Sequence, residues 1–106
     1  MRLVVLYIFL FIISIFAYAS TADDINRLRE AADSLHSVGR TDSAAIVGAQ
    51  AVQLALKQGD ALQIVGARSS QGVYLRSLGR IEEALESYEQ ALQIVTSDEF
   101  RRDPSQ

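Results

Sequence analysis

The sequence predicts an all-α protein: antiparallel helix-turn-helix pairs, stacked as a short α-solenoid and preceded by a targeting segment. Three observations lead to this prediction. Apolar residues recur at helical spacing after residue 22, two stretches 40 residues apart resemble each other, and residues 3–19 are almost entirely apolar. The single proline is Pro104, near the end of the chain, so it interrupts none of the predicted helices.

Residues 1–19 have the three-part pattern of a secretory signal peptide. Arg2 supplies a positive charge, an apolar run covers residues 3–16, and Ala17-Tyr18-Ala19 places small residues where a signal peptidase requires them. The alternative is an uncleaved membrane anchor, because residues 3–19 as a helix would be about 25 Å long, near the lower limit for spanning a bilayer. We therefore expect a periplasmic or secreted protein, or one anchored in the inner membrane by residues 3–19.

A repeat with a spacing of 40 residues organises the rest of the chain. Gly39-Arg40-Thr41-Asp42-Ser43-Ala44 aligns with Gly79-Arg80-Ile81-Glu82-Glu83-Ala84. In the same register, Gln50, Ala51 and Gln53 match Gln90, Ala91 and Gln93. Self-similarity at a fixed period is typical of proteins that stack similar helical units, so we expect two hairpins of the same design.

The apolar pattern predicts four helices, over residues 23–38, 41–57, 60–78 and 81–96. They form two hairpins, 23–57 and 60–96. Gly39 and Gly79 separate the helices of each hairpin, where a glycine can take the left-handed conformation that ends a helix. Between the hairpins, Gly59 is a stop signal and Asp60 an N-cap. Residues 97–106 lack a helical stripe and are predicted to be a disordered tail.

The last predicted helix shows the clearest separation of apolar and charged residues. Its apolar stripe consists of Ile81, Ala84, Leu85, Tyr88, Ala91, Leu92 and Val95, and its solvated face of Glu82, Glu83, Glu86 and Glu89. The small Ala84 and Ala91 on either side of Tyr88 let the paired helix approach closely. We expect the tyrosine ring to fill the groove that remains between the two helices.

At these positions the sequence resembles the tetratricopeptide repeat family. The family's signature residues fall on Gly72, Gly79, Ala84, Tyr88, Ala91 and Leu92 in the second unit, and on Gly39, Ala44 and Ala51 in the first. The first unit departs from the signature, with Ala32 at the glycine position and Gly48 at the aromatic position. The resemblance implies a solenoid with a longer repeat than the family's usual period of about 34 residues. HEAT-like repeats and a plain four-helix bundle are the alternatives.

The composition argues against most kinds of active site. The chain has no cysteine and one histidine, His36. A metal site built from several cysteine and histidine ligands is therefore excluded. The four glutamates of helix 81–96 are predicted to be solvated, whereas acid catalysis needs a carboxyl group in an apolar pocket. With a net charge of −3 and no cluster of lysine or arginine, nucleic acid is an improbable partner. We therefore predict no enzymatic activity, no cofactor and no metal.

The resemblance also implies where a partner binds, because the first helix of each hairpin lines a concave groove in such repeats. By register, the groove residues are Asn26, Arg29, Asp33, His36, Ser69, Val73 and Arg76. The implied function is an exported protein–protein interaction module that binds another protein or a peptide. The alternative is the N-terminal sensory or ligand-binding part of a larger membrane-bound bacterial sensor or transcriptional regulator.

The outer face of helix 81–96 is predicted to be left uncovered, because repeat stacks usually need three or more units and a capping helix. Either the chain is the N-terminal piece of a longer protein, or this helix docks onto a second copy or another partner.

Overall fold

The computed structural model describes the backbone of residues 2–97 and the side chains of residues 2–13 and 23–97. It contains α1 (Arg2–Ser37), α2 (Thr41–Gln58), α3 (Ala61–Ser77) and α4 (Ile81–Val95), and no strand within this part of the chain. The all-α prediction is confirmed. The tail prediction concerns mainly residues 98–106, which lie outside the described residues.

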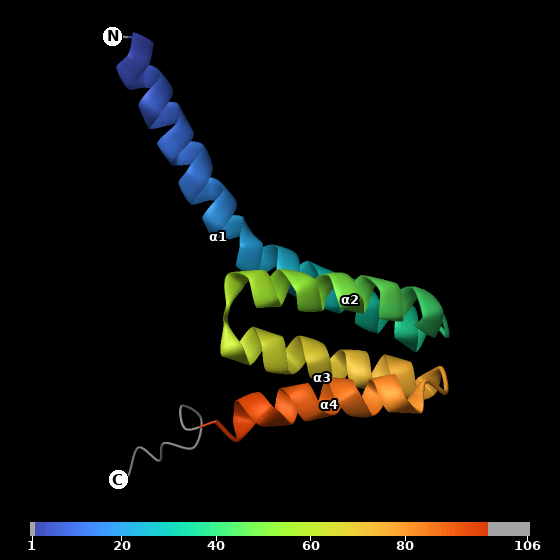
Figure 1. The fold of residues 1–106 in the computed structure, drawn as a ribbon. Coiled ribbons are helices and arrows are strands. Elements are labelled where there is room, and N and C mark those ends of the chain that lie inside the picture. The colour runs from blue at the N-terminus through green and yellow to red at the C-terminus, as the bar shows by residue number, and fades with distance from the viewer. Residues whose placement is uncertain (1, 98–106) are drawn as a thin grey trace, which may run out of the picture.

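The first helix is longer than predicted, since α1 is unbroken from Arg2 to Ser37 and does not begin near residue 23. The reason is that no glycine or proline occurs in this range, and Ala17–Asp24 contains nothing that stops a helix. Its first part extends away from the other helices (Figure 1). The apolar side chains of residues 3–13 are exposed. Among the described residues, no helix has the length and apolarity needed to cross a membrane. The signal-peptide and anchor interpretations stay predictions.

The two turns within the hairpins have the same structure. Gly39 and Gly79 adopt left-handed backbone conformations, with φ of 85° and 79°, which confirms the role predicted for both glycines. The next residue closes each turn: the N–H of Arg40 donates to the Leu35 carbonyl at 2.8 Å, and that of Arg80 to the Leu75 carbonyl at 2.9 Å. These bonds satisfy carbonyl groups that the ends of α1 and α3 would leave free.

The connection between the hairpins also follows the prediction. Gly59 ends α2 in the left-handed conformation, with φ of 80°. The Asp60 carboxylate then accepts hydrogen bonds from the backbone N–H groups of Leu62 and Gln63, at 3.0 and 3.3 Å. It therefore caps the N-terminus of α3.

Each helix packs against the next one along the chain: α1 against α2, α2 against α3, and α3 against α4 (Figure 1). α1 and α3 also touch. Small side chains dominate the core, which consists of two clusters: Ile25, Val52, Ala55, Ile64 and Ala67, and Ala32, Ala44, Ala45 and Tyr74. Because so many of these residues are alanine, the helix backbones can approach closely.

At the interfaces of α3 with α2 and with α4, an aromatic ring packs against a glycine. A Cβ atom added to Gly72 of α3 would lie 2.6 Å from Cε1 of Tyr88, so the tyrosine ring rests directly on the α3 backbone. A Cβ atom added to Gly48 of α2 would lie 3.2 Å from the ring of Tyr74. Tyr88 contacts α3 as expected but is only half-buried, whereas Tyr74 is 2% exposed. The aromatic residue at the centre of the fold is therefore Tyr74, not Tyr88.

Candidate interaction surface between α1 and α3

Tyr74 joins the first helices of the two hairpins. Its ring packs in the core, and its hydroxyl group donates a hydrogen bond to the Asp33 carboxylate of α1. Burial raises the pKa of Tyr74, and the hydrogen bond and negative charge of Asp33 raise it further, while Arg29 and Ser70 act in the opposite direction. Tyr74 therefore stays a neutral hydrogen-bond donor well into the alkaline range.

His36 lies beside the same tyrosine, near the end of α1. The centroids of the two rings are 5.2 Å apart, and the ring planes are inclined by 53°. Nδ1 of His36 is 3.0 Å from the hydroxyl oxygen of Thr41, the first residue of α2. The histidine is half-buried and contacts one residue of α2 and one of α3, so it ties the turn of the first hairpin to α3.

Arg29 lies one turn before Asp33 and reaches across to α3. A Cβ atom added to Gly66 would lie 2.8 Å from the guanidinium nitrogens of Arg29, so the absence of a side chain at Gly66 makes room for the cation. Arg29 is half-buried. A partly desolvated guanidinium group interacts more strongly with an anion than one surrounded by water, and its planar fork can bind a carboxylate with two hydrogen bonds.

Together these residues form a polar row along the contact of α1 with α3. On α1 it contains Arg29, Asp33 and His36, and on α3 it contains Gly66, Ser70 and Tyr74. The residues follow each other at steps of three or four, which keeps them on one side of each helix. We call this surface the polar row.

The structure brings together three of the four predicted groove residues of α1, but not those of α3. Arg29, Asp33 and His36 belong to the polar row, while Asn26 of the same helix is exposed. On α3, Val73 packs against the core cluster around Tyr74, Ser69 is half-buried and Arg76 is exposed. The residues of α3 that face α1 are thus displaced by one position from the register that the repeat implied.

Tyr74 was the residue that sequence reasoning missed. One signal pointed to it: the first hairpin has Gly48 at the position where the second has Tyr88. A missing ring at an aromatic position leaves a space in the core, and a large residue of a neighbouring helix has to fill it.

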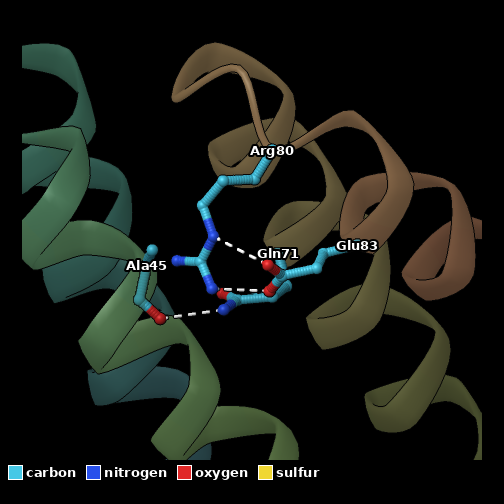
Figure 2. A network of polar contacts seen from close by, with 4 residues as sticks. All are labelled: Ala45, Gln71, Arg80 and Glu83. Carbon is cyan, nitrogen blue, oxygen red and sulfur yellow. Dashed lines mark hydrogen bonds and ion pairs between the residues drawn. The ribbon is translucent and has the colours of Figure 1, made fainter.

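A second surface feature lies on α2, α3 and the start of α4. It is a hollow of about 460 Å³ lined by Asp42, Ala45, Ile46, Ala49, Gln71, Leu75, Leu78, Arg80 and Glu83. Two of the lining residues are joined by a hydrogen bond, in which Nε2 of Gln71 donates to the Ala45 carbonyl at 2.8 Å (Figure 2). Beside it, Arg80 binds the Glu83 carboxylate with two hydrogen bonds, of 3.0 and 2.5 Å (Figure 2). Both members of this ion pair are about half exposed, so the pair contributes little to stability.

A second hollow, of about 810 Å³ and mostly apolar, is formed by α1 and α2, and is lined by Leu28, Ala49, Gln50, Gln53, Leu54, Leu56 and Lys57. No group of three or more His, Asp or Glu side chains is placed to hold a metal ion in residues 2–13 and 23–97.

The groups that the polar row gathers (a guanidinium, a carboxylate, an imidazole and a phenol) are suited to hydrogen bonding with a partner's polar groups. Comparisons with protein-family models, with curated proteins and with solved structures returned no match for this chain.

Proposed function

We propose that the chain is an exported protein–protein interaction module, a short α-solenoid of two tetratricopeptide-like hairpins without catalytic activity of its own. The observation that carries the proposal is the polar row. Hydrogen-bonding groups of both signs gather there on a surface shared by the first helices of the two hairpins. The repeated turns at Gly39 and Gly79 and the packing of successive helices support the repeat architecture.

The polar row suits an extended peptide with an acidic group. Arg29 supplies the positive charge, and the glycine opposite it leaves the guanidinium group close to the α3 backbone. Asp33 accepts the hydrogen bond of Tyr74 and has a second carboxylate oxygen with which to bind a backbone N–H of the peptide. An arginine binds a carboxylate through two hydrogen bonds of fixed geometry as well as through its charge. Arg29 would therefore set the position of the peptide.

The test is a peptide-display selection against the full chain in a mild detergent, followed by binding measurements on variants. Arg29→Ala should weaken the selected peptides by about tenfold or more, the effect of losing about 1.4 kcal/mol of binding free energy. Arg27→Ala is the matched control, because Arg27 is an exposed arginine of the same helix outside the polar row. Equal loss in both variants, or none in either, would place the binding site elsewhere.

A specific observation favours the second candidate, a sensory or ligand-binding part of a membrane-bound regulator. α1 continues as one helix from the exposed apolar residues 3–13 into the first hairpin. If residues 3–19 stay in a membrane, a continuous helix would transmit a change in the hairpins to the anchor. Intact-mass spectrometry of the exported chain distinguishes the two candidates, because cleavage after Ala19 would separate the apolar segment from the hairpins.

A further inference from the structure

The outer face of α4 carries a continuous apolar stripe. Ile81, Leu85, Leu92 and Val95 expose 56, 57, 59 and 42% of their surface, and the half-buried Tyr88 lies among them. The inner face, with Ala84, Ser87 and Ala91, is buried against α3. An exposed apolar stripe next to a row of charged residues marks an interaction surface.

The internal repeat supplies a template for what covers this stripe. A shift of 40 residues places Leu85, Tyr88, Leu92 and Val95 of α4 on Ala45, Gly48, Val52 and Ala55 of α2. All four residues of α2 are buried. Ala45 and Gly48 contact Gln71 and Tyr74 of α3, and Val52 and Ala55 belong to a core cluster with Ile64 and Ala67 of α3. The stripe that α4 exposes is therefore the one that α2 presents to an antiparallel helix.

The charges on α4 restrict the chemistry of the helix that could dock. α4 contains four glutamates and no lysine or arginine. In the repeat register, Glu82, Glu86 and Glu89 correspond to Asp42, Ile46 and Ala49. These positions of α2 line the hollow of about 460 Å³ together with Gln71, Leu75, Leu78 and Arg80. A helix that docked on α4 as α3 docks on α2 would thus face three carboxylates along this flank, which favours basic residues at the positions equivalent to Leu75 and Leu78.

The packing also restricts the size of one residue of the docking helix, the one at the position equivalent to Tyr74. On α2, Gly48 leaves room for the ring of Tyr74. On α4 the same position is Tyr88, whose ring lies on Gly72 of α3 and is half-buried, so less room is left for a second aromatic ring than at Gly48. The docking helix therefore needs a small residue at the position equivalent to Tyr74.

We propose that the outer face of α4 binds an amphipathic α-helix of a partner protein. The helix runs antiparallel to α4, has a small residue opposite Tyr88, and carries lysine or arginine along the flank that faces Glu82, Glu86 and Glu89. This surface is separate from the polar row, and the inference does not depend on the peptide binding proposed there.

The charges and the opposite end of the stack disfavour a second copy as the occupant. In an antiparallel pair of α4 helices related by a twofold axis, the acidic flanks of both copies would lie on the same side and repel each other. Head-to-tail stacking would use α1, whose positions equivalent to Ile64, Ala67 and Tyr74 are Asp24, Arg27 and Ser34. These residues are exposed and polar, so they suit water rather than an apolar stripe.

The probe is a labelled synthetic peptide with the sequence of residues 60–78, in which Tyr74→Ala makes room for Tyr88. One version also carries Leu75→Lys and Leu78→Lys, and the other carries Leu75→Glu and Leu78→Glu. Binding to the full chain in a mild detergent is followed by fluorescence anisotropy at low salt. We expect the lysine peptide to bind at least about tenfold more tightly than the glutamate peptide, and this preference to shrink as salt is added.

Two variants of the chain locate the site. Leu85→Gln combined with Leu92→Gln should weaken the lysine peptide by about tenfold or more, because both leucines would lose apolar contact. Ile46→Gln is the matched control: Ile46 is 65% exposed on α2, outside the α4 stripe, and its replacement should leave binding unchanged. Circular dichroism checks that both variants keep their helical content.

Absence of binding, equal binding of the two peptides, or equal loss in the α4 variant and the control would overturn the proposal. It would also be overturned if sedimentation equilibrium showed a dimer that the α4 variant dissociates, because a second copy would then be the occupant.

Discussion

Replacing Gly72 with alanine should destabilise the fold, although alanine is the better helix former. In an exposed helix interior, glycine to alanine gains about 1 kcal/mol. At Gly72, however, the new Cβ atom would lie 2.6, 2.7 and 2.9 Å from three atoms of the Tyr88 ring. Overpacking of this kind costs about 1–3 kcal/mol, because the ring or the helix has to move. We expect a net loss of about 1 kcal/mol in the free energy of unfolding, measured by urea denaturation and circular dichroism.

The effect of Gly72→Ala on stability should change sign when the Tyr88 ring is removed. Tyr88→Ala alone should cost about 2 kcal/mol, below the roughly 3–5 kcal/mol of a fully buried aromatic residue, because the ring is half-buried. In that background Gly72→Ala meets no ring and should stabilise the helix by about 1 kcal/mol. The double-mutant cycle therefore predicts a coupling free energy of about 2 kcal/mol between the two positions.

Gly66→Ala is the control within the same helix. The atoms nearest to its Cβ atom are those of the Arg29 guanidinium group, at the end of a flexible side chain that can swing into solvent, so this variant should be neutral or slightly stabilising. The packing argument would be refuted if Gly72→Ala and Tyr88→Ala were additive, or if Gly72→Ala and Gly66→Ala had the same effect on stability.

Three further predictions concern the buried tyrosine, the turns and the cap. Tyr74→Phe should cost about 1.5–3 kcal/mol by removing the hydrogen bond to the Asp33 carboxylate. Because the pKa of Tyr74 is raised, its contribution to stability is complete below the pH at which an unfolded tyrosine ionises, about 10, and declines as the pH rises above it; an ultraviolet titration should show one late-ionising tyrosine that Tyr74→Phe removes. Gly79→Val, at φ of 79°, should lower stability by at least about 1 kcal/mol, and a melting curve equal to that of the wild type would contradict the assigned turn. Asp60→Ala should cost about 1 kcal/mol and Asp60→Asn much less, since asparagine also caps helices; equal losses would show that the cap is unimportant.

The parts of the fold that the sequence predicted are those that local energies determine. A helix that must end and turn back within three residues needs a left-handed residue, and glycine is the residue that adopts this conformation without strain. Gly39 and Gly79 could therefore be assigned their conformation without knowledge of the tertiary structure. The cap at Asp60 depends on two backbone N–H groups close by in sequence, and it was predictable for the same reason.

The extent of α1 and the composition of the polar row were not predictable in this way. The expected boundary between the targeting segment and the first hairpin does not require a break in the helix. α1 therefore continues through it. The residues of α3 that face α1 depend on how α3 rotates about its own axis when it packs on α2 and α4. That rotation is set by contacts far apart in sequence, with Tyr74 against Gly48 on one side and Gly72 against Tyr88 on the other.

These two contacts follow one rule with the roles exchanged. At the interface of α2 with α3, the ring comes from α3 and the glycine from α2; at the interface of α3 with α4, the ring comes from α4 and the glycine from α3. α3 can supply both because Gly72 and Tyr74 are two positions apart, which on a helix places them on different sides. The first hairpin thus has Gly48 where the repeat signature has an aromatic residue, and the ring of Tyr74 fills the space that the glycine leaves. On α4 the Tyr88 ring lies on Gly72 of α3 and is only half-buried, so a helix docked on α4 has less room opposite it than Tyr74 has opposite Gly48, and a small residue fits best there.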